Sequence, residues 1–238
     1  MSHPTRDWGI RGTLRFFSDE KDMARQASAW LAQRIRTGLL EYGTFHLVLA
    51  GGNTPALCYD ELAHEPLDWK RVTLSLGDER CLPIGHPERN DTLIQRHLLV
   101  GKASKARFIT MHGEHGPDQA ALDHTQRWQE WGPIDLALLG MGEDGHTASL
   151  FPDNPVLDIL DCPVVAVRGA PKPPSERVSL SLSALQSARE RVFLVTGSKK
   201  REALERLDQG EPLPSLLVGP SQWFIELSAC PTHLIPAT

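Results

Sequence analysis

Residues 138–152, with the sequence LLGMGEDGHTASLFP, combine the residue types that most strongly indicate chemistry in this chain. The mainly apolar segment Ile134 to Leu139 predicts a buried strand that runs directly into a glycine-rich turn. Asp144 and His146 stand at the exit of this turn, where an imidazole can take a proton from an attacking water. Asp144 can either orient the imidazole ring or support the loop, and both alternatives remain open. We therefore expect His146 to be a catalytic residue at the carboxyl end of a strand.

The three glycines of this turn, at positions 140, 142 and 145, match the G-x-G-x-x-G spacing of a dinucleotide-binding loop. Glycines let the backbone take positive φ values and approach a ligand closely. A dinucleotide fold, however, needs a full helix straight after the last glycine, within a unit of about 30 residues. Pro152 and Pro155 come too soon for such a helix. The turn therefore indicates a catalytic loop, and we expect no cofactor.

A second glycine turn lies in the sequence LAGGNTP at residues 49–55, between a predicted strand and a predicted helix. Thr54 suits the N-cap of that helix and Pro55 its first turn, where a missing N–H costs nothing. The free N–H groups of such a turn, with the positive end of the helix, form an anion site. No Gly-Lys-Ser/Thr follows, which excludes a Walker loop, and a tight turn without a ligand is the alternative. From this block we expect Gly51, Gly52, Asn53 and Thr54 to contact the substrate.

The block GDER at residues 77–80 follows the predicted strand Val72 to Leu76. Ligands of parallel α/β sheets bind beyond the carboxyl ends of the strands, where this block and both glycine turns lie. Arg80 offers a planar fork that can hold two phosphate oxygens, and Asp78 or Glu79 can hold Arg80 in place. An exposed ion pair of little energetic value is the alternative.

Two further loops carry cations. The proline-rich loop at residues 171–177 ends in Arg177 and contains Lys172, for which a solvated loop charge is an equal alternative. The sequence GSKK at residues 197–200 places Lys199 and Lys200 at a helix start, where a positive charge opposes the helix dipole. A bound phosphate would explain this unfavourable position, and two exposed lysines on a charged helix are the alternative.

Strands and helices alternate along the chain, which predicts an α/β fold with a mainly parallel sheet covered on both faces. Neither repeats nor a low-complexity linker interrupt it, so we expect one domain over residues 1–238. Apolar runs predict strands at residues 14–17, 45–50, 72–76, 134–139, 164–167, 192–195 and 223–227, and alternation predicts a half-exposed strand at 177–182. Helices are expected at residues 23–39 (capped by Ser18 or Asp19), 55–63, 91–99, 118–131 and 200–208.

Composition narrows the class of protein. The net charge of −5 argues against a general nucleic-acid binder and requires a local cationic cluster for any anionic substrate. The four cysteines are scattered without a C-x-x-C pair, which predicts reduced thiols and no zinc site. No apolar run reaches the roughly 18 residues of a membrane span, and the first residues lack the apolar core of a signal peptide. We therefore expect a cytoplasmic protein without a membrane partner. His46, within a buried strand, is expected to be a hydrogen-bonded core histidine.

Taken together, these blocks resemble the 6-phosphogluconolactonases, which share a superfamily with the glucosamine-6-phosphate deaminases. The resemblance implies a three-layer α/β/α fold, and hydrolysis of 6-phospho-D-glucono-1,5-lactone to 6-phosphogluconate in the oxidative pentose phosphate pathway. It also implies that no metal is required. The lysine of the family's G-x-x-K pattern falls on Lys200. Asn53 stands where the family usually has Ser or Thr, and Arg89-Asn90 where Ser-Asn is more typical, which makes Asn90 a weaker candidate.

The expected chemistry is simple, because a δ-lactone is an activated ester that water can attack without a covalent nucleophile. The sequence accordingly has no G-x-S-x-G elbow. The developing oxyanion needs N–H donors or a cation, for which Gly51, Gly52 or an arginine are candidates. The expected catalytic residues are His146, Asp144 and Arg80, and the expected substrate-binding residues are Gly51, Gly52, Asn53, Thr54, Asp78, Arg177 and Lys200.

Two other functions remain open. Glucosamine-6-phosphate deaminases typically follow D-G-H with a segment containing N-E-P, whose glutamate works with the histidine, whereas residues 149–152 read SLFP. A non-catalytic sugar-phosphate sensor is the alternative from another class of protein. Such regulators carry a DNA-binding domain, and only about a dozen residues precede the first predicted strand.

Overall fold

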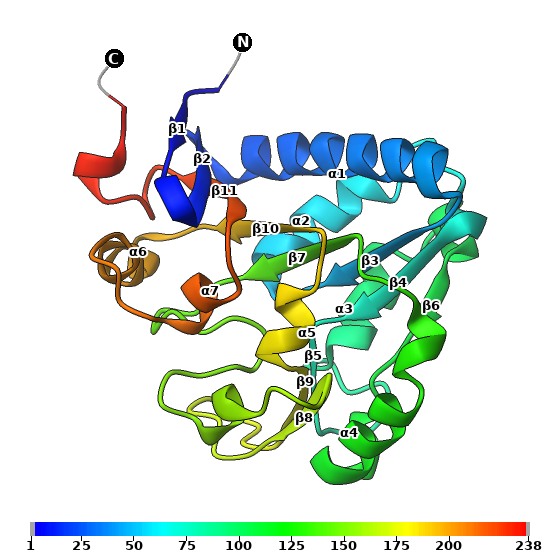
Figure 1. Ribbon diagram of the computed structural model, residues 1–238. Helices are drawn as coiled ribbons and strands as arrows, with labels where there is room; N and C mark the ends of the chain where they lie inside the picture. The colour runs from blue at the N-terminus through cyan, green and yellow to red at the C-terminus, as the bar shows by residue number, and fades with distance from the viewer. Residues whose placement is uncertain (1–2, 237–238) are drawn as a thin grey trace.

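A computed structural model describes residues 3–236, whose strands form two sheets (Figure 1). The strands are β1 (Thr5–Asp7), β2 (Gly12–Phe17), β3 (Phe45–Leu49), β4 (Val72–Leu76), β5 (Asp78–Arg80), β6 (Arg107–Ile109), β7 (Leu136–Gly140), β8 (Val164–Val167), β9 (Arg177–Leu180), β10 (Glu190–Val195) and β11 (Ser221–Glu226). The large sheet has the order β1-β2-β11-β10-β7-β3-β4-β6, and its neighbours are parallel except for β1 and β2. The small sheet is antiparallel, with the order β5-β9-β8.

The chain reverses its direction across the large sheet between β3 and β7. It first adds β4 and β6 on one side of β3, and later adds β7, β10 and β11 on the other side. At such a reversal the loops from the carboxyl ends of the two central strands diverge and leave a crevice, in which ligands bind. All five residues of β3 are buried, as expected of a central strand covered on both faces.

Helices cover both faces of the large sheet, which confirms the predicted α/β/α fold. The helices are α1 (Glu20–Tyr42), α2 (Asn53–Leu62), α3 (Asn90–His97), α4 (Pro117–Gln126), α5 (Leu182–Gln186), α6 (Arg201–Asp208) and α7 (Pro214–Leu217). Helices α1 and α2 pack together on one face, and α5, α7 and the small sheet, against which α4 packs, lie on the other (Figure 1). Helix α1 has one of the two predicted caps, because the Asp19 carboxylate accepts a hydrogen bond from the Asp22 N–H.

Some elements differ from the predictions. A strand forms where one was predicted at 177–182, but β9 ends at Leu180. The prediction that one of its faces is exposed is wrong, since all its residues are buried between β5, β8 and α4. The helix predicted at 118–131 ends at Gln126, and a separate 3-10 turn follows at Trp128–Trp131. Strands β1, β5 and β6 have three residues each, and α5 and α7 are similarly short, so they show too few residues for a periodic pattern.

His46 is the core histidine that its sequence position predicts. It lies in β3 with 4% of its surface exposed, and its Nε2 is 2.8 Å from the Ser75 hydroxyl oxygen. Burial lowers the pKa of His46 to about 4, so the ring is neutral near pH 7. This histidine therefore packs the sheet and has no part in the site described below.

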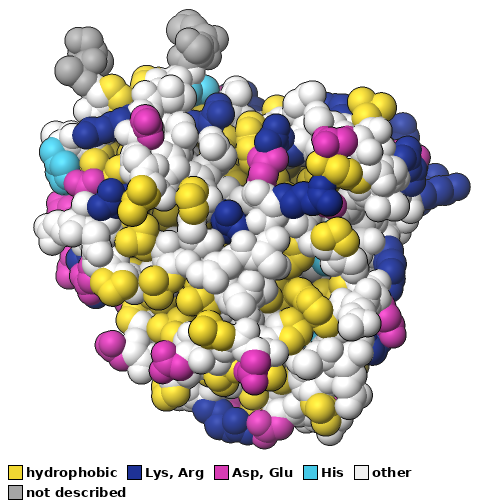
Figure 2. Space-filling model, viewed as in Figure 1, with side chains coloured by type: hydrophobic (Ala, Val, Ile, Leu, Met, Phe, Trp, Pro, Cys, Tyr) yellow, Lys and Arg dark blue, Asp and Glu magenta, His cyan; other side chains and the backbone are white. Residues whose placement is uncertain are grey.

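The surface carries charges of both signs. On the face shown in Figure 2, basic and acidic side chains are interspersed and no continuous basic area forms, in line with the net charge of −5. The four cysteines have free thiols; Cys58 and Cys230 are buried and the other two are half-buried. None of the helices between residues 3 and 236 has both the length and the apolar character needed to cross a bilayer.

Candidate active site

A cleft of about 530 Å³ lies at the carboxyl ends of β3, β4 and β7, at the reversal point of the large sheet. Eight of the ten residues predicted for the site line it: Gly51, Gly52, Asn53, Asp78, Arg80, His146, Arg177 and Lys200. Thr54 and Asp144 are not among its lining residues. The remainder of the lining is Ala50, Glu88, Asn90, Gly140, Met141, Gly142, Ala148, Phe151, Lys172 and Pro173. The fold thus brings together groups that are far apart in the sequence.

His146 and Asp144 form a hydrogen-bonded pair at the wall of the cleft. Asp144 Oδ1 lies 2.6 Å from His146 Nδ1 and also accepts the backbone N–H of His146 at 3.1 Å. Burial raises the pKa of Asp144, but the hydrogen bonds and charge of His146 outweigh burial and lower the pKa to about 2. The ionised carboxylate can accept a hydrogen bond from the Nδ1–H of the neutral ring, which leaves the Nε2 lone pair free to act as a base. Asp144 therefore contacts both the ring and the backbone of the loop.

Two of the three glycines of the histidine loop (residues 140–152) are needed, each for a different reason. Only Gly145 has a positive φ, of 83°, so the expected use of positive φ holds for one of the three. Gly142 is needed because of close packing: a Cβ there would lie 2.0 Å from His146 Nδ1 and 2.5 Å from Asp144 Oδ1. A Cβ on Gly140 would meet no atom within 4 Å. The loop is thus built around the His146–Asp144 pair.

The diglycine turn (Gly51 and Gly52) needs glycine at both positions, at Gly52 because of its backbone conformation and at Gly51 because of a close neighbour. Gly52 has a φ of 104° and occupies the N-cap position of α2. A Cβ on Gly51 would lie 1.9 Å from Oδ1 of Asn90. The prediction that Thr54 caps α2 is wrong, because its hydroxyl lies 2.6 Å from the Thr196 hydroxyl and no side chain caps this helix. The first N–H groups of α2 are therefore free of a side-chain cap, beside a cleft lined by the turn.

The Asp78 carboxylate contacts three other residues around the cleft. Its Oδ1 accepts a hydrogen bond from Asn90 Nδ2 at 3.1 Å, and its Oδ2 accepts the Ser149 hydroxyl. Oδ2 also lies 3.9 Å from Arg177 Nη1. Asp78 is buried and links β5 to α3 and to the histidine loop.

The guanidinium of Arg80 is held by a backbone group and not by a carboxylate. Its Nη1 donates to the carbonyl oxygen of Glu88, and its Nε is buried without a hydrogen-bond partner in residues 3–236. Neither Asp78 nor Glu79 pairs with the Arg80 guanidinium, since the ion pairs of these carboxylates within the described chain go to Arg177 and Arg89. Glu79 instead holds Arg80 through its backbone N–H, at 2.7 Å. A buried donor without a partner is costly.

Arg177 holds the proline-rich loop. Its Nε donates to the Pro174 carbonyl oxygen at 3.1 Å and its Nη2 to that of Lys172 at 2.9 Å. The guanidinium carbon lies 5.7 Å from the centre of the Phe151 ring, and burial lowers the pKa of Arg177. With these bonds Arg177 fixes the loop that places Lys172 in the cleft wall.

Lys200 lies in the 3-10 turn Ser198–Lys200, directly before α6. It was predicted to be the first residue of that helix. Burial lowers the pKa of Lys200. Positive charge exceeds negative charge in the cleft lining. The cations are Arg80, Lys172, Arg177 and Lys200, and the carboxylates are Asp78 and Glu88. This excess matches the local cationic cluster that a protein of net negative charge needs in order to bind an anionic substrate.

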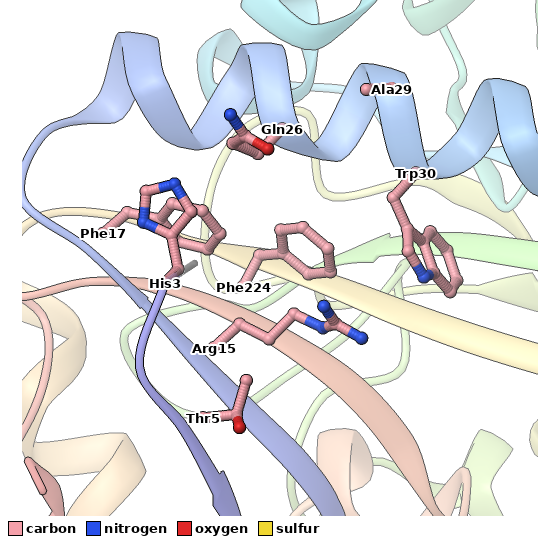
Figure 3. A pocket seen from close by; sticks show the side chains of 8 residues that line it. All are labelled: His3, Thr5, Arg15, Phe17, Gln26, Ala29, Trp30 and Phe224. Atoms are coloured by element: carbon pink, nitrogen blue, oxygen red, sulfur yellow. The ribbon is translucent and has the colours of Figure 1, made fainter. Parts of the chain in front are cut away.

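A second cleft, of about 610 Å³, lies between α1 and the strands β2 and β11 (Figure 3). It is lined by His3, Thr5, Arg15, Phe17, Gln26, Ala29, Trp30 and Phe224, and the Arg15 guanidinium lies 5.5 Å from the centre of the Phe224 ring. It is larger than the first cleft, but none of the predicted site residues lies there and no carboxylate lines it. The first cleft is therefore the candidate active site. Within residues 3–236, no cluster of three His, Cys, Asp or Glu side chains could hold a metal ion.

Comparison with known proteins identifies the family of the chain. The family model described as glucosamine-6-phosphate isomerases/6-phosphogluconolactonase matches residues 18–226. The chain belongs to this family. It is 39% identical over 198 residues to the 6-phosphogluconolactonase of Pseudomonas aeruginosa, covering 80% of this chain and 83% of the relative. It is 34% identical over 245 residues to the 6-phosphogluconolactonase of Homo sapiens, covering 94% and 95% of the two chains.

A solved structure gives the same result. The crystal structure of a 6-phosphogluconolactonase from Shewanella baltica superposes with a TM-score of 0.83 at 25% identity, covering 92% of this chain and 100% of that chain. The family predicted from the sequence is confirmed, and with it the prediction that the protein is an enzyme.

For several residues that line the cleft, the sequence offered weak evidence or none. Asn90 was a weaker candidate and Lys172 an open alternative, and both line the cleft. Glu88 and Phe151 carried no signal, because an exposed loop carboxylate and an apolar residue after a turn are common anywhere. Ala148 has a φ of 49°, an unusual backbone conformation for a residue with a Cβ, and no sequence pattern predicts it.

Proposed function

We propose that the protein hydrolyses 6-phospho-D-glucono-1,5-lactone to 6-phosphogluconate. The observation that carries this proposal is the presence of His146, paired with Asp144, in the same cleft as Arg80 and Lys200. A base beside a cationic pocket suits a substrate that has both a hydrolysable carbonyl and a phosphate. The relatives named 6-phosphogluconolactonase, which match most of the chain, support the same reaction. The cytoplasmic location expected from the sequence stays a prediction.

In the proposed reaction, Nε2 of His146 takes a proton from a water molecule as the water oxygen attacks the lactone C1. The former carbonyl oxygen becomes negatively charged, and N–H groups of the diglycine turn or the Arg80 guanidinium can stabilise it. Collapse of this intermediate breaks the bond between C1 and the ring oxygen, and the imidazolium returns its proton to that oxygen. Asp144 keeps the ring oriented and stabilises the imidazolium during both steps.

Deamination of glucosamine 6-phosphate is the alternative within this family, whose model covers both activities by name. The segment after His146 offers no carboxylate for it. Phe151 packs against the His146 ring at 4.5 Å between ring centres, and the Ser149 hydroxyl donates to Asp78. An apolar neighbour beside a single base fits lactone hydrolysis better than a deamination that shares proton transfers between two groups.

An assay of both reactions tests the proposal. We expect the protein to accelerate the opening of freshly prepared 6-phosphogluconolactone and to release no ammonia from glucosamine 6-phosphate. The rate without protein serves as the baseline, because the lactone also opens spontaneously. Ammonia release without lactone opening would identify a deaminase, and binding of 6-phosphogluconate without turnover would identify a sensor.

Gly142→Ala is expected to lower kcat for the lactone at least about tenfold, because the added methyl group displaces the His146–Asp144 pair. The atoms that it would meet belong to side-chain ends, so the free energy of unfolding should fall by no more than about 2 kcal/mol. The control is Gly77→Ala, whose Cβ would have no contact closer than 3.6 Å. Equal kcat values for the two variants, with thermal denaturation measured alongside, would contradict the role given to Gly142.

A further inference from the structure

Glu79 does not line the cleft, yet it contacts two elements that do. It belongs to β5 and is completely buried, with 0% of its surface exposed. Its Oε1 accepts the backbone N–H groups of Arg80 at 2.7 Å and Asn90 at 2.8 Å. Its Oε2 accepts the backbone N–H of Asp91 at 2.8 Å. One carboxylate therefore holds β5 and the first turn of α3 together.

Helix α3 depends on this carboxylate because it has no cap of its own. The residue at its N-cap position, Arg89, makes no side-chain cap hydrogen bond. The first N–H groups of a helix have no partner within the helix, and a negative charge at that end is favourable. Glu79, eleven residues before Asn90, supplies both the acceptor and the charge. The cap of α3 is thus a tertiary contact, unlike the local cap of α1.

Asn90 extends this constraint to the diglycine turn. Its Nδ2 donates to the backbone oxygen of Asp78 at 2.8 Å, and its side chain fills the space that a Cβ on Gly51 would need. Asn90 and Gly51 both line the cleft, as does Arg80. Glu79 and Asn90 therefore connect three parts of the site: Arg80 in β5, the start of α3 and the diglycine turn.

The buried charge of Glu79 is compensated by neighbouring groups. Arg89 Nε lies 3.9 Å from Glu79 Oε2, and the same guanidinium pairs with Asp91 and, at 2.8 Å, with Glu114. Burial raises the pKa of Glu79 to about 7, and the backbone N–H bonds oppose this rise. Three donors directed at the two oxygens match the ionised form, which only accepts hydrogen bonds.

We propose that Glu79 is a positioning residue that sets the relative places of Arg80, Asn90 and the diglycine turn, and thereby the affinity of the cleft for its phosphorylated ligand. The inference rests on the proposed function. Glu114 provides the contrast, because it pairs with the same Arg89 guanidinium at 2.8 Å and lies 3.2 Å from His112 Nδ1, whereas Glu79 accepts backbone N–H groups of β5 and α3. A purely stabilising role predicts that loss of either carboxylate lowers the stability and leaves the affinity for the ligand unchanged.

Glu79→Gln tests the proposal, since it keeps the size of the side chain and turns one acceptor oxygen into a donor. We expect calorimetry to show at least tenfold weaker binding of 6-phosphogluconate, and KM for the phosphorylated lactone to rise more than kcat falls. Glu79→Asp keeps two acceptor oxygens and should retain more of the affinity than Glu79→Gln. Glu114→Gln, the matched control, should lower the melting temperature without changing the affinity.

Amide hydrogen exchange provides a measurement that needs no turnover. In Glu79→Gln the amides of Asn90 and Asp91 should exchange at least tenfold faster, while those of the distant strand β11 should not change. Faster exchange with unchanged affinity and KM would reduce Glu79 to a helix cap and overturn the positioning role. Unchanged exchange would overturn the cap as well. A parent protein that neither binds 6-phosphogluconate nor opens the lactone would contradict the proposed function instead, with the exchange result still valid.

A double-mutant cycle covers the case in which Glu79→Gln does not fold. Glu79→Asp and Asn90→Ala should weaken 6-phosphogluconate binding by less in combination than the product of their separate factors, because both act through one network. Independent factors for the two substitutions would overturn the proposal.

Discussion

His146→Ala is expected to lower kcat for lactone hydrolysis by roughly 10² to 10⁴, the range of a lost general base, and by no less than tenfold. The His146 side chain is one-fifth exposed at the cleft wall, so its removal should leave the fold intact. KM should change little, because the imidazole is not among the cations that would hold the phosphate. Steady-state kinetics, corrected for spontaneous opening of the lactone, measure the effect.

Two further variants sharpen this result. His64→Ala removes an exposed histidine outside the cleft and should leave kcat unchanged. Asp144→Asn keeps the size of the side chain that orients the ring but removes its charge, so it should lower kcat by less than His146→Ala does. Near-normal kcat in His146→Ala would remove this residue from the role of base.

Arg80→Ala or Lys200→Ala is expected to weaken 6-phosphogluconate binding about tenfold or more. Each charge-assisted contact with a phosphate should contribute about 1.5 to 3 kcal/mol, and about 1.4 kcal/mol corresponds to a factor of ten. The same variants should discriminate less between the phosphorylated lactone and glucono-δ-lactone. Lys199→Ala is the control, because Lys199 is exposed beside Lys200 and does not line the cleft. Calorimetry with 6-phosphogluconate and kinetics with both lactones measure these effects.

The kinetics also separate the two roles open to Arg80. If its guanidinium acts on the lactone carbonyl, kcat falls alike for both substrates and discrimination is retained. If it holds the phosphate, the loss is confined to the phosphorylated substrate. Arg177→Ala should weaken binding through the loop that Arg177 fixes. Unchanged affinity in the Arg80, Arg177 and Lys200 variants would contradict the phosphate site.

Much of the fold follows from local patterns in the sequence. The predicted strands at 72–76 and 164–167 match β4 and β8 residue for residue, because short segments rich in apolar and β-branched residues favour strands. The parallel large sheet follows from the alternation of strands and helices. Since parallel strands end at one edge, the sequence could also predict that the glycine turns and the block with Arg80 would meet.

The wrong predictions share a physical cause. Thr54 is of a residue type that often caps helices, but its hydroxyl oxygen lies 2.6 Å from that of Thr196, which follows strand β10. The segment of strand β9 alternates like a half-exposed strand, yet α4 and the neighbouring strands of the small sheet bury Ser179 as well. In both cases a partner distant in the sequence decides the outcome, and a local pattern contains no information about that partner.

The sequence by itself determined the chemical groups of the site and their places at strand ends, because these depend on residue type and on periodicity along the chain. It also placed Asp144 two residues from His146, close enough for a local hydrogen bond. Only the tertiary structure decided that Arg80 is held by the Glu88 carbonyl, and that Glu79 caps α3. These choices depend on how loops from separate strands pack against one another, and each buried polar group takes whichever partner that packing brings within reach.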